Sequence, residues 1–306
     1  MDPTVGGIQA GSELALRPVL YLQVLLNGLV LGGLFACIAA GFSLVWGVLN
    51  VINILHGSFI VLGAYAAWYA YGALGIHPFL SVLLVAPLFF ALGYAVQRLL
   101  LNRVIAAPVL LTLTLTFGLD LMLSNAMLAA FKADFRKLVL DPPLGVLSLG
   151  PVVLPLDRLA AMALALLLTL LLYLVLSRSR TGRAIVAVRM DREAASLMGV
   201  NVPRIYAVTF GLGALMAGVA GPLIAMIFPI SPLTGPVYLG KAFVVCVLGG
   251  LGSVPGAMVG GLVLGVVESF AALWFGPEHA ITVSFALLIG MLVFRPTGLL
   301  GRKGYE

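Results

Sequence analysis

Three ionisable residues stand inside long apolar runs of this sequence: Asp120, Lys241 and Glu268. A charged side chain at the centre of a lipid bilayer costs about 3 kcal/mol or more, so each of them needs a partner, a polar path or a protein contact. The sequence places no acid and base together at one membrane face, and it contains no His and Cys at metal-ligand spacing. We therefore predict no catalytic residue and no metal site.

Asp120 belongs to a polar stripe, because four residues recur at intervals of four along the apolar run 108–130: Thr112, Thr116, Asp120 and Ser124. This spacing places them on one face of a helix. The stripe could form a wall of a path through the membrane or a contact with a second membrane subunit. Alternatively, the hydroxyls bond back to their own helix and Asp120 bonds to a neighbour. In neither case does Asp120 face lipid.

Lys241 and Glu268 flank a turn rich in residues that break helices: Gly249, Gly250, Gly252, Pro255 and Gly256. Counted from Ser253 in this turn, Lys241 lies 12 residues back and Glu268 lies 15 residues forward. At 1.5 Å per residue the two charges reach similar depths of roughly 18 and 22 Å. We predict an ion pair that fixes two neighbouring crossings rather than one that contacts a solute.

A further polar cluster, with Asn53 and His56, stands at the start of the second apolar run. An imidazole can titrate near neutral pH, which would suit a role in a path or at a subunit interface. A His bonded within a helix interface is the commoner case. Small residues also recur every four positions, at Gly28 and Gly32 and at Gly261 and Gly265, as in helices that pack closely in lipid.

The composition defines the class of fold that must position these residues. The chain has 306 residues, of which 62% are hydrophobic and 9% charged, so it lacks the polar surface of a soluble protein. Apolar runs of roughly the 20-residue length that spans a bilayer as a helix lie at about 21–47, 54–74, 78–99, 108–130, 159–177 and 204–228. Three further apolar runs follow, at about 237–250, 256–275 and 280–294. We predict an all-α polytopic membrane protein in one domain, 1–306, with about eight or nine crossings.

The run 237–250 is short for a crossing, so we expect one short or broken helix there. Lys and Arg concentrate in segment 178–203 and near the C-terminus, which places both in the cytoplasm and the N-terminus outside. Residues 131–158 then form the largest extracytoplasmic loop. The net charge of +6 reflects this topology and indicates no nucleic-acid partner.

The arginine-rich stretch "LSRSRTGRAIVAVRMDREAASLMGVNVPRIY" contains the signals of a short capped helix. Asp191 is a good N-cap, Glu193 suits the first turn, and Gly199 suits the C-terminal end. The apolar residues Ala194, Ala195, Leu197 and Met198 would leave a patch outside the membrane that needs a partner. The arginines could instead serve only to hold the loop in the cytoplasm.

The chain resembles permease subunits of ATP-binding-cassette importers for branched-chain amino acids, of the LivH type. The resemblance runs from this stretch to "GLGALMAGVAG" and recurs in "NGLVLGGLFACIAAGFSLVWGVLNVINILHGSFIVLGA" and "GKAFVVCVLGGLGSVPGAMVGGLVLGVVES". The resemblance implies a bacterial inner-membrane protein that pairs with a second permease, two ATPase subunits and an extracytoplasmic binding protein. It also implies that the coupling helix docks on an ATPase through Asp191, Arg192, Glu193, Ala194, Ala195, Leu197, Met198 and Gly199.

The sequence contains no GxxxxGK[ST] motif, so the chain itself has no nucleotide-binding loop. We expect no cofactor here, and ATP and magnesium on the partner subunits. Permeases similar to these also carry other amino acids, amides and urea, so the solute stays open. A stand-alone secondary transporter is the less favoured alternative, because the sequence shows no convincing repeat and offers only Asp120 and Glu268 as ion-coupling carboxylates.

Overall fold

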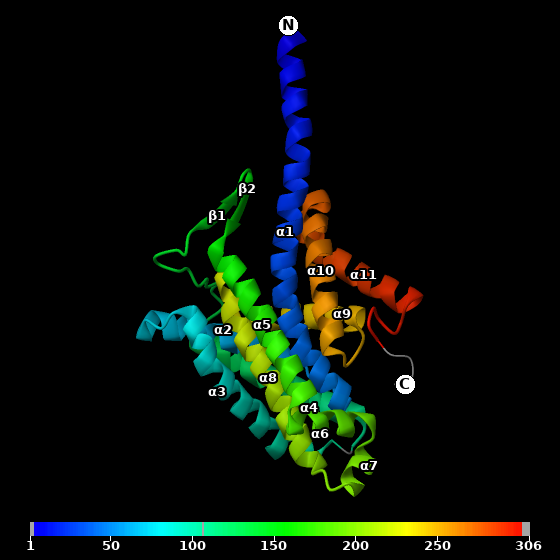
Figure 1. Cartoon of the computed structure of the whole chain (residues 1–306). Coiled ribbons are helices and arrows are strands. Elements are labelled where there is room, and N and C mark those ends of the chain that lie inside the picture. The colour runs from blue at the N-terminus through cyan, green and yellow to red at the C-terminus, as the bar shows by residue number, and fades with distance from the viewer. Residues whose placement is uncertain (1–2, 106, 302–306) are drawn as a thin grey trace.

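The computed structural model describes residues 3–105 and 107–301, which form a bundle of long helices (Figure 1). Within them, eight helices are long and apolar enough to cross a membrane. The prediction of an all-α polytopic membrane protein is confirmed. The long helices are α1 Pro3–Leu49, α2 Leu55–Leu74, α3 Pro78–Leu99, α4 Val109–Phe131, α5 Leu156–Arg178, α8 Val202–Ile227, α9 Gly235–Gly249, α10 Val254–Phe275 and α11 Ala280–Phe294.

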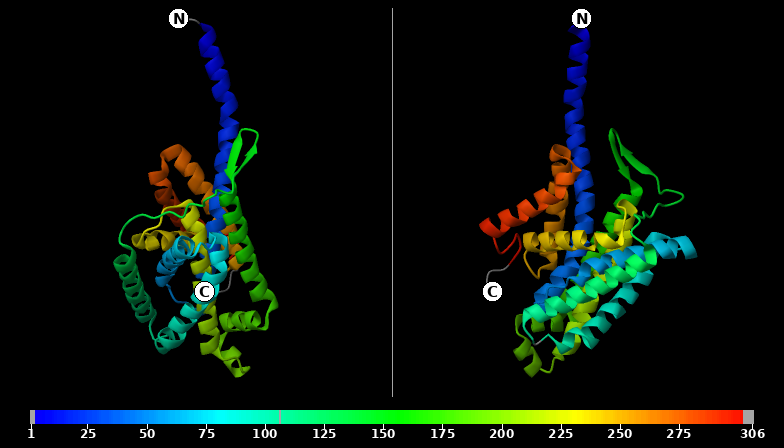
Figure 2. Two further views of the ribbon diagram at one scale, coloured as in Figure 1. Left: turned by 90° about the vertical axis from the view of Figure 1, so that its left-hand side faces the viewer. Right: turned by 180° about the vertical axis from the view of Figure 1, so that it is seen from behind.

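Shorter elements mark the two ends of the bundle (Figures 1 and 2). One end carries an antiparallel hairpin of strands β1 Val146–Leu149 and β2 Val152–Pro155, and we call it the hairpin end. The opposite end carries the helices α6 Arg180–Met190 and α7 Arg192–Leu197, and we call it the α6–α7 end. Three single turns, η1 Leu101–Arg103, η2 Pro232–Thr234 and η3 Pro277–His279, complete the described elements.

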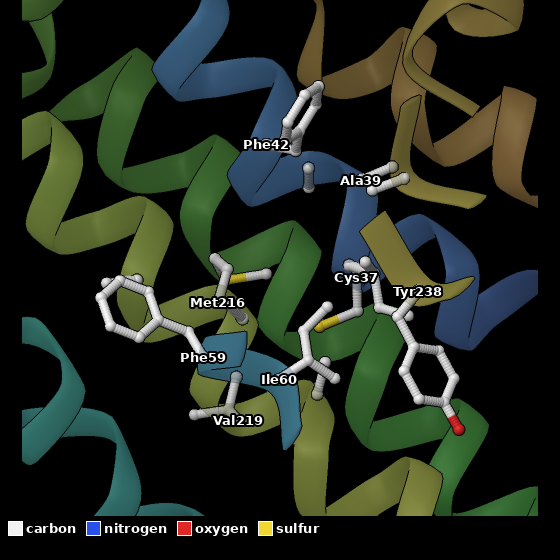
Figure 3. Close-up of a cluster of buried hydrophobic side chains, with 14 of the residues drawn as sticks. Cys37, Ala39, Phe42, Phe59, Ile60, Met216, Val219 and Tyr238 are labelled. Atoms are coloured by element: carbon white, nitrogen blue, oxygen red, sulfur yellow. The ribbon is translucent and has the colours of Figure 1, made fainter. Parts of the chain in front are cut away.

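The hydrophobic core lies around α1 and α8, the two helices whose spans are 89% buried inside the chain. Figure 3 shows part of it, with Phe42 of α1, Phe59 of α2 and Met216 of α8 among the buried side chains. By contrast, α4 and α11 each bury only 11% of their spans and expose long apolar side chains. These two helices therefore offer most of their surface to lipid or to another subunit.

Helix α2 begins inside the bundle rather than at its end. The preceding residues 50–54 are not helical, and the carbonyl of Ile52 accepts a hydrogen bond from Thr116 Oγ1 of α4 at 3.0 Å. His56, in the first turn of α2, bonds to the carbonyl of Ile38, which lies 11 residues before the end of α1. Those 11 residues rise roughly 16 Å along α1. The chain thus turns back along α1 through the non-helical segment 50–54 before α2 starts.

Helix α9 begins at the same depth, because its first residue, Gly235, packs on the first turn of α2. A Cβ on Gly235 would lie 3.3 Å from the carbonyl carbon of Gly57. Residues 228–234 descend to this point from the hairpin end, where Ile230 pairs with Arg136. The broken crossing expected at 237–250 is therefore present. A second one, which the sequence did not predict, comprises residues 50–74, and α2 is not among the eight span-forming helices.

The small-residue motifs serve packing within this chain. A Cβ on Gly28 would lie 2.7 Å from the Cα of Val266, and one on Gly32 would lie 2.6 Å from the Cα of Leu262. Gly261 and Gly265 face α1 in the same way. Helices α1 and α10 thus approach each other backbone to backbone, as expected where association in lipid relies on close contact.

Candidate functional site

The polar stripe of α4 faces α2 and the non-helical segment 50–54 before it. Thr112 and Thr116 are buried, and Thr112, Thr116 and Ser124 each donate a hydrogen bond to a carbonyl of α4 itself. The single hydroxyl proton of Thr116 is shared with the carbonyl of Ile52, which also lies 3.0 Å from Oγ1. These bonds agree with the packing alternative for the three hydroxyls, since each is satisfied without a ligand.

Asp120 differs from the rest of the stripe. Its Oδ1 accepts a hydrogen bond of 2.5 Å from Ser58 Oγ of α2. The side chain is partly exposed, and within residues 3–105 and 107–301 it forms no ion pair. A carboxylate at mid-membrane depth thus has one oxygen held by a hydroxyl and no cationic partner in the described chain.

Asn53 and His56 lie in the interior of the subunit. Both are at most 1% exposed, so in this structure neither reaches a surface that a second subunit could contact. His56 Nε2 donates to the Ile38 carbonyl at 3.0 Å, and the ring meets Phe42 edge-on. His56 Nδ1 and both amide atoms of Asn53 have no hydrogen-bond partner in the described chain. His56 is therefore a helix-interface residue. Its Nε2 is hydrogen-bonded, and its Nδ1 has no hydrogen-bond partner among the described residues.

Lys241 and Glu268 form the predicted ion pair, with Nζ 2.7 Å from Oε2. Ser284 Oγ of α11 donates to the other carboxylate oxygen at 2.6 Å, and the ammonium lies 4.5 Å from the ring centre of Phe35 in α1. The charge pair therefore connects α9, α10, α11 and α1. It links more helices than the two neighbouring crossings that the sequence indicated.

The turn predicted between these crossings is also present. Helix α9 ends at Gly249, and Gly250 and Gly252 have φ values of +102° and +76°, which favour glycine. Pro255 stands in the first turn of α10, and the Ser253 hydroxyl accepts a hydrogen bond from Gly256 N at 3.0 Å. The chain reverses here without a long loop.

Arg189 of α6 contacts this turn, a connection that the sequence did not reveal. Its Nη1 donates to the carbonyl of Gly252 at 2.6 Å. The sequence indicated only a role for the arginines in topology, and no spacing relates positions 189 and 252. The bond joins the α6–α7 segment directly to α9 and α10.

Helix α7 has the caps that its sequence predicted. Asp191 Oδ1 accepts hydrogen bonds from Glu193 N at 2.8 Å and Ala194 N at 3.0 Å, and Gly199 has a φ of +84°. The helix ends at Leu197, two residues before Gly199. Helix α6, which the sequence analysis treated only as an arginine-rich stretch, precedes it and buries Ile185 and Val188.

The apolar residues of α7 do not form one outward face, which corrects the sequence interpretation. Ala195 is only 5% exposed, because it lies on the side of α7 that packs against the chain. Leu197 and Met198 are 89% and 84% exposed. Arg192, Glu193 and Ala194 are also exposed. The available contact surface is therefore the C-terminal tip of α7 and its polar side.

A cavity of about 470 Å³ at the α6–α7 end brings two of the predicted groups together. Thr112 of the α4 stripe lines it on one side, and the α6–α7 junction lines it on the other. Its polar lining residues are Asn50, Thr112, Arg189, Asp191, Arg192, Glu193 and Tyr206. Thr112, at one end of the stripe, and the α6–α7 junction thus line one cavity, although 77 positions separate Thr112 from Arg189.

Among the described residues, no group of three or more His, Cys, Asp and Glu side chains could hold a metal ion. What the fold does contain is a set of polar groups buried along the inside of a helical bundle, two crossings that break at mid-depth, and a short helix with an exposed apolar tip. These features define a polytopic helical membrane protein with polar groups in its interior.

The chain belongs to the family described as branched-chain amino acid transport system / permease component, which matches residues 24–292. It is 37% identical to the high-affinity branched-chain amino acid transport system permease protein BraD of Pseudomonas aeruginosa, over 94% of this chain and 97% of that protein. The corresponding LivH proteins of Salmonella typhimurium and Escherichia coli are 36% and 34% identical, with the same coverage. No solved structure matches the chain.

Proposed function

We propose that this chain is the transmembrane permease subunit of an ATP-binding-cassette importer for branched-chain amino acids. Relatives of nearly the same length carry that transport system in their names, which supports the solute class. The sequence lacks the GxxxxGK[ST] loop, which supports ATP binding and hydrolysis, with magnesium, on separate subunits. The chain is then a transport subunit rather than an enzyme.

The observation that carries this proposal is the exposed tip of α7. Leu197 and Met198 are among the most exposed large apolar side chains of the described residues, and they lie on a helix capped by Asp191. Apolar side chains held in this way outside a bilayer favour a protein partner. A groove on an ATPase subunit is the partner we assign, and α7 is then the coupling helix.

The assembly that follows has four kinds of component. This permease pairs with a second, similar permease, two ATPases bind at the α6–α7 end, and an extracytoplasmic binding protein delivers the solute. The α6–α7 end and the C-terminus then lie in the cytoplasm, and the hairpin end and the N-terminus lie outside, in a bacterial inner membrane. The exposed faces of α4 and α11 offer area for the second permease.

The solute is a branched-chain amino acid in this proposal, with amides or urea as the alternative for a permease of the same family. Selectivity is expected to reside mainly in the binding protein. Calorimetric titration of the binding protein of the same system with leucine, isoleucine, valine and urea decides between them.

The test of the assembly is purification of the native complex through a tag on this chain. We expect a second permease and two ATPase subunits to copurify, and Leu197→Asp to release the ATPases while both permeases stay together, because it places an unpaired charge in the docking groove. Val139→Asp is the control, since Val139 is 67% exposed but lies in the loop at the hairpin end. A complex that lacks ATPases in the wild type, or keeps them with Leu197→Asp, would refute the proposal.

A further inference from the structure

We propose that Asp120 binds the ammonium group of the transported amino acid within the membrane. This inference rests on the proposed function, which supplies a zwitterionic solute. Asp120 lies 11 residues from either end of α4, so its carboxylate is roughly 16 Å from both ends of the helix. It therefore lies near the middle of the bilayer, where a negative charge needs compensation.

Glu268, a carboxylate buried within a crossing, shows how this protein compensates such a charge. Glu268 is 4% exposed, and its two oxygens are taken by Lys241 and Ser284. Asp120 has a hydrogen bond from Ser58 to one oxygen, no ion pair in the described chain, and a partly exposed side chain. The described part of the chain therefore supplies no cation to compensate Asp120.

The surroundings of Asp120 hold the carboxylate in place without neutralising it. Ser58 is the fourth residue of α2, so its hydroxyl lies in the first turn of a helix that starts inside the membrane. No side chain caps that helix. The N-terminal end of a helix carries a partial positive charge, which interacts favourably with the carboxylate but leaves its second oxygen able to accept a bond.

An ammonium group fits this site because it donates short, charge-assisted hydrogen bonds to a carboxylate. The polar stripe leads from Asp120 through Thr116 to Thr112, which lines the cavity at the α6–α7 end. Thr116 and Thr112 are 0% and 2% exposed, so this structure closes the way between the site and the cavity. A solute bound at Asp120 would thus be separated from the α6–α7 end by a closed passage.

The first test replaces Asp120 by asparagine in the complete complex, reconstituted in vesicles with its binding protein. The amide oxygen still accepts the bond from Ser58, so packing is preserved while the charge is lost. We expect leucine uptake to fall about tenfold or more, because a charged hydrogen bond is removed, while the subunit composition of the complex stays the same. Ser58→Ala, which removes the hydroxyl but keeps the charge, should retain most of the uptake.

Normal uptake by Asp120→Asn in an assembled complex would overturn this proposal and leave the proposed function intact. Loss of the second permease from the Asp120→Asn complex would also overturn it, because Asp120 would then be a contact between subunits. Absence of ATPases from the wild-type complex would instead refute the proposed function.

A second test measures the charge near Asp120 by chemical labelling. It does not depend on transport activity in an Asp120 variant. Ser124→Cys places a thiol one turn from Asp120 on the same stripe, and the native Cys37 and Cys246 are buried. We expect a cationic methanethiosulfonate, the trimethylammonioethyl compound, to label this thiol faster than the anionic sulfonatoethyl compound, and solute-loaded binding protein to slow both. The preference should vanish when Asp120→Asn is added.

Met122→Cys is the matched control, since Met122 is 71% exposed on another face of α4. Its labelling should show neither the charge preference nor protection by the solute. Equal rates for the two reagents at Ser124→Cys, or a charge preference that survives Asp120→Asn, would overturn the assignment.

Discussion

Lys241 Nζ lies 2.7 Å from Glu268 Oε2, and each partner is tied to a further helix. Ser284 of α11 bonds to the carboxylate, and Phe35 of α1 lies under the ammonium. The side chains are 17% and 5% exposed, so both charges have left water and depend on each other. The pair therefore fixes the positions of α9 and α10 against α1 and α11.

The first prediction concerns the two halves of this ion pair. Lys241→Met alone should destabilise the protein by about 3–5 kcal/mol, because it leaves a buried carboxylate without its cation. Lys241→Met with Glu268→Gln should recover much of that loss, because no uncompensated charge remains. Thermal unfolding of the purified protein in detergent measures both. Losses that simply add in the double variant would show that the pair is not coupled.

The second prediction concerns the contact between α1 and α10. Gly32→Ala should lower thermal stability clearly, because its Cβ would meet the backbone of Leu262 at 2.6 Å and force the helices apart. Gly118→Ala and Gly290→Ala are matched controls, since both glycines lie within helices and nothing lies within 4 Å of an added Cβ. The controls should melt at or slightly above the wild-type temperature. A Gly32→Ala protein as stable as these controls would contradict the close approach.

Local signals in the sequence predicted local structure well. The cap at Asp191, the left-handed Gly199 and the turn at Gly250 and Gly252 each follow from the conformational preferences of a few adjacent residues. The ion pair of Lys241 and Glu268 was also predictable, because the depth of each residue in the membrane could be counted from the same turn.

Features set by distant contacts were not predictable in this way. The apolar run that contains α2 has the length of a full crossing, and only the bonds of His56 to Ile38 and of Thr116 to Ile52 show where the helix starts. Similarly, a six-residue helix has no periodicity long enough to show that Ala195 faces inward. The contact of Arg189 with Gly252 was hidden for another reason, because it joins residues 63 positions apart that no local preference relates.

The third prediction concerns Arg189. Arg189→Gln should weaken the link between α6 and the turn that joins α9 to α10, because it replaces the charged guanidinium that donates to the Gly252 carbonyl by a shorter, neutral amide. In the reconstituted complex we expect more ATP hydrolysed per amino acid transported, with the subunit composition unchanged. Arg180→Gln is the control, because Arg180 is exposed at the start of the same helix. An unchanged ratio for Arg189→Gln would limit this bond to a structural role.

The last prediction separates the cap of α7 from its charge. Asp191 accepts hydrogen bonds from Glu193 N and Ala194 N, and the loss of an N-cap side chain costs about 0.5–2 kcal/mol. That is a large share of the stability of a six-residue helix, which cannot persist on its own propensity. Asp191→Ala should therefore let α7 fray and carry the exposed Leu197 out of position.

Asparagine caps a helix about as well as aspartate but carries no charge, so Asp191→Asn should leave the helix formed. We expect the affinity for the ATPase subunits, measured by titrating them onto the permease pair in detergent, to fall several-fold for Asp191→Ala and little for Asp191→Asn. The expected difference follows because docking must then also supply the free energy that orders the helix. Equal losses in the two variants would mean that the carboxylate itself contacts the ATPase, and that α7 does not depend on its cap.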